Sequence, residues 1–174
     1  MTRPRFTRLQ IACHWLTAAL ILLIVALPYG SEAFFEALLG GKGNVFTLHK
    51  SLGVLVLLLT VLRLFARRRA VEPLPAKPPL ERCMVAAGHG LLYLLLLALP
   101  LSGLLFGSRP FSLFWLVEVG PLPLSSDVRG LAKDVHILGQ YLLFAMLIGH
   151  AGAALWHHYV RRDDTLKGML PLLR

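Results

Sequence analysis

The chain has 174 residues, a formal net charge of +9 and a 56% share of hydrophobic residues. That share is too high for an ordinary soluble domain, in which apolar residues make up about 45–50% even when glycine is included. The basic residues do not form a separate domain with interleaved aromatic side chains, which argues against a nucleic-acid-binding protein.

Four apolar segments predict helices over residues 9–28, 45–66, 84–106 and 134–160. Each is long enough to cross the hydrocarbon core of a bilayer, which takes about 17–25 residues. A membrane barrel would instead show shorter segments in which apolar and polar residues alternate. The sequence therefore predicts an all-α, integral membrane four-helix bundle, with residues 1–174 forming one domain and neighbouring helices antiparallel.

The basic residues are distributed unequally between the two ends of these helices. Thirteen of the 18 lie toward one side: in the N-terminal segment, between the second and third helices, after the fourth helix, and, as Arg63, in the last turn of the second helix. Because cytoplasmic loops carry an excess of Lys and Arg, both termini are predicted to lie in the cytoplasm. The outer side keeps the other five: Lys42, Lys50, Arg109, Arg129 and Lys133.

The first three predicted helices each carry one histidine near their start. His14 lies on the cytoplasmic side, His49 on the outer side and His89 on the cytoplasmic side again. Residues 29–44 are predicted to form a short external loop. Residues 71–79, with the sequence VEPLPAKPP, are predicted to be a proline-rich cytoplasmic linker that cannot be helical throughout.

An external loop over residues 107–133 precedes the fourth helix and contains the apolar segment FSLFWLVEVG. At about ten residues this segment is too short to span a bilayer and is predicted to lie at the membrane interface. The fourth helix carries His136 near its outer end and His150, His157 and His158 nearer its inner end. The 14-residue spacing of His136 and His150 places them within about 40° of one face and about 21 Å apart along the helix axis.

The depths of the histidines predict two pairs, His14 with His150 on the inner side and His49 with His136 on the outer side. Two imidazoles that face each other across a bundle suit haem, which takes one axial ligand from each side. The chain contains no CxxCH sequence for covalent attachment, so two stacked b-type haems are predicted. Three alternatives are hydrogen-bonded packing histidines, a zinc site with about four ligands at one depth and a transporter site.

Other residues at the same depths fit a haem cofactor. Gly53 lies one turn after His49 and leaves room for a flat macrocycle, although small residues also serve ordinary helix packing. His89 is an alternative to His14 as the inner ligand, or a residue that binds a propionate or packs nearby. Four basic residues are candidates to bind the propionates: Arg8, Arg63, Lys50 and Lys133.

Several motifs together resemble the bacterial cytochrome b561 family over nearly the whole chain: RLQIACHW, HKSLG, GHGLLYLLLLALPLSG, ALWHHY and the tail DDTLKGMLP. That family consists of four-helix, dihaem electron carriers of the bacterial inner membrane. The resemblance implies His14, His49, His136 and His150 as the four axial ligands. One type within the family, the superoxide oxidases, passes electrons from periplasmic superoxide to ubiquinone, which implies that His157 lies at the quinone.

The predicted function is therefore that of an oxidoreductase, embedded in membrane lipid, that takes electrons from superoxide or another small reductant and reduces ubiquinone. The candidates to steer the superoxide anion are Lys50, Arg109, Arg129 and Lys133. His157 is a candidate to exchange a proton with the quinone. The alternative is a cytochrome b subunit that anchors a hydrogenase or other dehydrogenase and relays its electrons. The short extensions favour the independent enzyme, for which a protein partner is possible but not required.

Overall fold

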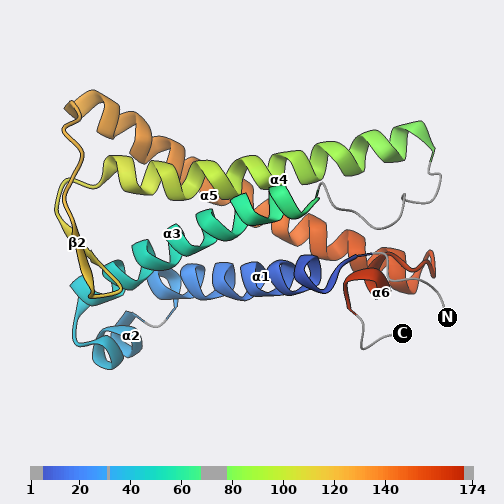
Figure 1. Ribbon diagram of the computed structural model, residues 1–174, viewed down its shortest axis with the longest axis horizontal. Helices are drawn as coiled ribbons and strands as arrows, with labels where there is room; N and C mark the ends of the chain where they lie inside the picture. The colour runs from blue at the N-terminus through green and yellow to red at the C-terminus, as the bar shows by residue number, and fades with distance from the viewer. Residues whose placement is uncertain (1–5, 31, 68–77, 171–174) are drawn as a thin grey trace.

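The computed structural model describes residues 6–30, 32–67 and 78–170. Within these ranges, four long helices run side by side (Figure 1): α1 (Arg8–Tyr29), α3 (Lys42–Arg67), α4 (Pro79–Phe106) and α5 (Ser126–Tyr159). Each of the four is long and apolar enough to cross a membrane. The predicted all-α membrane bundle is thus confirmed. Residues 71–77 of the predicted linker lie outside the described ranges, as do six of the basic residues on the predicted cytoplasmic side: Arg3, Arg5, Arg68, Arg69, Lys77 and Arg174.

Three of the long helices begin at residues whose chemistry suits a helix start. Thr7 and Gln10 form a capping box at α1, in which each side chain accepts a bond from the other residue's backbone N–H. Helix α4 begins at Pro79 rather than residue 84, because proline is well suited to the first helical position. Helix α5 begins after the N-cap Ser125 rather than at residue 134. The prediction began later because the first turns of α5 contain several polar residues and precede the apolar segment.

Both predicted external loops contain secondary structure. Residues 29–44 include the short helix α2 (Glu32–Leu39). The segment FSLFWLVEVG folds as an antiparallel hairpin of β1 (Phe111–Leu113) and β2 (Val117–Val119). Phe114 and Trp115 adopt left-handed backbone conformations at its turn. The turn is held against α3 because the Phe114 N–H donates to Ser51 Oγ at 2.9 Å.

The middle of the bundle is filled by buried aliphatic side chains, which we call the aliphatic layer: Ile21, Val56, Leu95, Leu96, Leu99 and Leu143. Three of these residues lie about two helical turns from a histidine, toward the middle of the bundle. They are Ile21, which follows His14, Val56, which follows His49, and Leu143, which follows His136. The layer therefore separates the two depths. Outward-facing side chains such as Leu22 and Ile148 are strongly exposed, as suits contact with lipid.

Helix α4 packs closely along α5, and α1 along α3. Gly139 of α5 permits the first contact, because a Cβ atom there would lie 3.0 Å from Leu99 Cδ2 of α4. At the predicted cytoplasmic end, the short helix α6 (Thr165–Met169) folds back beside the start of α1 (Figure 1). The Trp15 indole N–H fixes this tail by donating to the Met169 carbonyl oxygen at 2.7 Å.

Candidate functional site

Four histidines from three helices face one another in two pairs. The ring centroids of His14 on α1 and His150 on α5 are 6.1 Å apart, with an angle of 55° between the ring planes. The ring centroids of His49 on α3 and His136 on α5 are 6.3 Å apart, at 71°. The structure thus brings together the same pairs that the depths indicate, one at each level of the bundle.

The separation of the rings matches the space that an iron atom with two imidazole ligands needs. An imidazole nitrogen lies about 2 Å from a bound metal and about 1.2 Å from its own ring centroid, so two opposed ligands have centroids roughly 6.4 Å apart. Both pairs lie within a few tenths of an ångström of this separation. In the described part of the chain, no group of three or more His, Cys, Asp or Glu residues could hold a metal ion, whereas haem requires two ligands per level.

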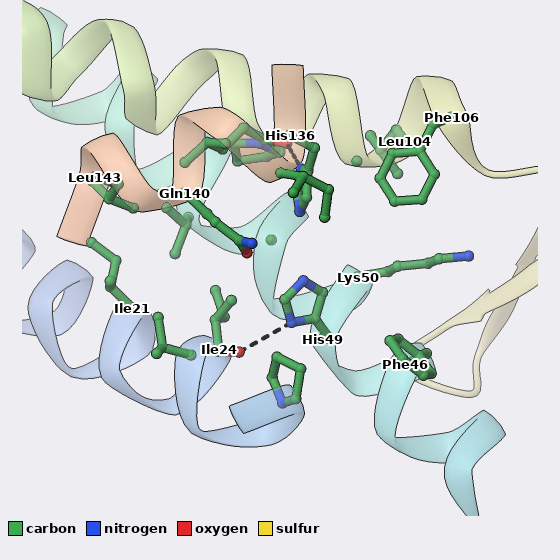
Figure 2. A pocket seen from close by; sticks show the side chains of 18 of the residues that line it. Ile21, Ile24, Phe46, His49, Lys50, Leu104, Phe106, His136, Gln140 and Leu143 are labelled. Carbon is green, nitrogen blue, oxygen red and sulfur yellow. Dashed lines mark hydrogen bonds between the residues drawn. The ribbon is translucent and has the colours of Figure 1, made fainter. Parts of the chain in front are cut away.

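Backbone carbonyl groups orient the outer pair. His49 Nδ1 donates to the Ile24 carbonyl oxygen at 3.1 Å, and His136 Nδ1 donates to the Leu99 carbonyl oxygen at 2.9 Å. Ser102 Oγ lies 3.3 Å from the same nitrogen of His136. Each ring therefore keeps its Nε2 atom free of these bonds, and that nitrogen is the one available to a metal. Figure 2 shows His49 and His136 approaching each other from opposite walls of a cavity.

This cavity has a volume of about 450 Å³, within the range of about 300–1,000 Å³ that is usual for cofactor and ligand sites. Its walls are mostly aliphatic and aromatic, and its inner end is closed by Ile21 and Leu143 of the aliphatic layer. Gly53 lies on its wall, and a Cβ atom there would meet no protein atom within 4 Å. The position of Gly53 therefore suits the close approach of a flat group.

The inner pair has a basic neighbour instead of a carbonyl. The Arg63 guanidinium donates to His14 Nδ1 at 3.2 Å and lies over the ring of Tyr93, with its central carbon 5.6 Å from the ring centroid. His89 also reaches this level, because its ring centroid is 5.6 Å from that of His150. That separation is shorter than the roughly 6.4 Å that two opposed ligands require, whereas the 6.1 Å between His14 and His150 is close to it. His14 therefore fits the ligand position opposite His150 better than His89 does.

The predicted cationic residues lie in different places. Lys50 lines the outer mouth of the cavity with Arg109, and its ammonium group lies 5.0 Å from the centroid of the Phe111 ring. Lys133 is exposed on α5 and is not one of the residues that line the cavity. Arg129 donates to the backbone carbonyls of the outer loop, those of Gly107, Leu122 and Leu124. Arg8 is exposed at the start of α1.

The predicted quinone residue His157 lies near the end of α5 and is paired with an acid. Its Nδ1 donates to Asp163 Oδ2 at 2.5 Å, and the Thr165 N–H donates to the other carboxylate oxygen at 2.8 Å. Burial acts to raise the pKa of Asp163, but the hydrogen bonds from Thr165 and His157 outweigh it and hold that pKa well below its ordinary value. Asp163 is therefore ionised at neutral pH.

Sequence reasoning missed several residues that orient the histidines. The carbonyls of Ile24 and Leu99 belong to apolar residues, whose letters give no sign of a polar role. Gly103 was also missed, although a Cβ atom there would lie 3.1 Å from His136 Cε1. Asp163 could have been found from the sequence, because it follows His157 by six residues just after the end of an apolar helix.

Comparison with known proteins agrees with this geometry. A family model described as prokaryotic cytochrome b561 matches residues 5–172. The chain is 32% identical to cytochrome b561 homolog 1 of Escherichia coli (strain K12), over 96% of this chain and 97% of the relative. It is 30% identical to the probable superoxide oxidase CybB of Yersinia pestis, over 98% of both chains, and 32% identical to cytochrome b562 of Cereibacter sphaeroides, over 96% of both.

These matches cover the whole bundle, including both histidine levels and the folded-back tail. They imply binding of b-type haem and a general role in electron transfer. The four apolar helices and the family together indicate a multi-pass protein of the bacterial inner membrane. The chain belongs to the prokaryotic cytochrome b561 family.

Proposed function

We propose that this protein is a dihaem cytochrome that carries electrons from superoxide on the outer side of the membrane to ubiquinone on the cytoplasmic side. The observation that carries the proposal is the presence of two opposed imidazole pairs, with centroids 6.1 and 6.3 Å apart, at two levels of one bundle. When bound, haem supplies one-electron redox chemistry at each level. The similarity to a probable superoxide oxidase supports superoxide as the donor.

In this proposal, His14 and His150 are the ligands of the inner haem, and His49 and His136 are those of the outer haem. A neutral imidazole that binds iron through Nε2 carries its proton on Nδ1 and cannot accept a bond there. The present bond from Arg63 to His14 Nδ1 would therefore have to break for His14 to serve as an iron ligand. The released guanidinium is then placed to bind a propionate, as the sequence indicates for Arg63.

At the outer side, the cavity mouth carries two positive charges from Lys50 and Arg109. Positive charge at the rim of a low-dielectric cavity raises the local concentration of an anion such as superoxide. Lys133 lies outside this mouth, so we assign the main attraction to Lys50 and Arg109. The same pair could neutralise the propionates of the outer haem.

At the inner side, His157 and Asp163 are assigned to the quinone. Two superoxide anions each lose one electron and become dioxygen, and ubiquinone takes up these two electrons with two protons from the cytoplasmic side. Because His157 donates through Nδ1 to Asp163, its Nε2 atom is free of that bond and can donate to a quinone carbonyl oxygen when it carries a proton. The Asp163 carboxylate holds the ring in this orientation, and the ring can pass its Nε2 proton to the reduced quinone.

The proposal is tested by mixing the purified protein with superoxide in a stopped-flow instrument and following the haem absorption bands, with and without ubiquinone. We expect rapid haem reduction, followed by reoxidation when quinone is present. Replacement of His157 by Ala should leave both haem spectra unchanged and slow the reoxidation. Absence of haem reduction by superoxide, together with co-purification of a large iron–sulfur protein, would instead indicate the electron-relay subunit.

A further inference from the structure

Helix α1 contains a proline at position 28, close to its outer end. In an α-helix the N–H group of each residue donates to the carbonyl oxygen four residues earlier, so position 28 would normally serve Ile24. Proline has no N–H group, and its ring also crowds that carbonyl oxygen. Pro28 therefore leaves the Ile24 carbonyl without the donor that the helix would otherwise supply.

The Ile24 carbonyl accepts a hydrogen bond from the neighbouring helix instead. His49 Nδ1 of α3 lies 3.1 Å from Ile24 O, and Figure 2 shows this bond at the wall of the outer cavity. Because a carbonyl oxygen can only accept, the proton of the neutral ring must lie on Nδ1. The lone pair of Nε2 then faces His136 across the cavity.

We propose that Pro28 is a positioning residue for the outer haem ligand: by withholding a helical N–H group, it reserves the Ile24 carbonyl for His49. The inference rests on the proposed function, in which His49 binds the outer haem iron. Pro28 itself would not bind the iron. It acts through Ile24, whose carbonyl fixes the tautomer and the orientation of the His49 ring.

The same bond also affects the strength of the ligand. An imidazole that donates its second N–H to a carbonyl becomes more basic at the metal-binding nitrogen. A more basic ligand stabilises ferric over ferrous iron, so this bond lowers the reduction potential of the outer haem. At the inner level His14 has Arg63 rather than a carbonyl as its neighbour, so Pro28 should influence only the outer potential.

The experiment compares the wild-type protein with Pro28→Ala and Val25→Ala. Pro28→Ala restores an N–H group that competes with His49 for Ile24 O, and it removes two carbon atoms from the cavity wall. Val25→Ala also removes two carbon atoms from a residue that lines the same cavity, but it leaves the hydrogen-bond pattern of α1 unchanged. Potentiometric titration of both haems, electron paramagnetic resonance of the ferric states and haem content per chain are the readouts. His136→Ala and His150→Ala assign each signal to one level.

We expect the outer haem potential to rise in Pro28→Ala and its ferric resonance to shift, with the inner haem unchanged and Val25→Ala close to wild type. Selective loss of the outer haem from Pro28→Ala alone would support the inference as well. An unchanged outer potential, or an equal shift in Val25→Ala, would overturn it. A wild-type protein that lacks two haem signals would instead overturn the proposed function, so the two failures are distinguishable.

Discussion

Replacement of Gly103 by Ala tests whether α4 sets the orientation of His136. The new Cβ atom would lie 3.1 Å from His136 Cε1 and 3.3 Å from Nδ1. Favourable contacts between such atoms begin at about 3.5–4.0 Å, so the ring must retreat from α4 by roughly 0.4–0.9 Å. The bond from His136 Nδ1 to Leu99 O, now 2.9 Å, would then lengthen beyond the usual limit of about 3.2 Å.

The size of the effect follows from these contacts. Overpacking of a close-packed site costs about 1–3 kcal/mol, which corresponds to roughly a 5- to 140-fold loss of affinity for the outer haem. The inner haem should be unaffected, because the aliphatic layer separates His150 from the altered site. Gly103→Ala should therefore lose or weaken one haem of two.

The measurement is haem content per chain, together with the absorption and redox titration of each level after dilution. Gly130→Ala is the matched control, because a Cβ atom at this exposed position of α5 meets no atom within 4 Å. It should keep both haems. If Gly103→Ala also keeps both haems with wild-type spectra and potentials, the argument that α4 confines the His136 ring is wrong.

Three further changes test other contacts. Asp163→Asn should slow steady-state quinone reduction by about tenfold or more and leave the haem spectra unchanged. Asp164→Asn alters the exposed ion pair with Lys167 and should leave the rate of quinone reduction unchanged. Arg129→Lys cannot reproduce the bonds to three backbone carbonyls, so protease should cleave the outer loop faster; equal cleavage rates would contradict this. Trp15→Phe removes the donor to Met169 at a cost of about 1 kcal/mol, and amide hydrogen exchange in α6 should rise about fivefold; unchanged exchange would show that other contacts hold the tail.

The sequence was sufficient to predict the helices and the histidine levels, because both depend on period and length. Apolar segments of membrane-spanning length allow few folds, and the rise per residue fixes how far apart His136 and His150 lie. The extensions of α4 to Pro79 and of α5 to Ser126 were missed because a proline at the first helical position of α4 and the cap Ser125 of α5, rather than apolar residues, mark those starts.

The contacts around the histidines could not be predicted in the same way. Backbone carbonyls such as those of Ile24 and Leu99 are present at every position, so no residue letter distinguishes the two that bind a histidine. The hairpin turn at Phe114 and Trp115 was equally hidden, because its positive φ angles fall on aromatic residues rather than on glycine. The separate roles of Lys50 and Lys133 depend on the direction in which each side chain leaves its helix.

The aliphatic layer has a consequence for the energetics of the membrane. Ile21, Val56 and Leu143 present no group that could carry a proton, whereas an electron can tunnel between the two levels that they separate. In the proposed function, negative charge therefore moves inward without a compensating proton, and protons are consumed in the cytoplasm. Each electron works against a voltage that is negative inside, at up to about 2.3 kcal/mol per 100 mV for a full crossing. Removal of superoxide would thus help to energise the membrane, and a high voltage would slow it.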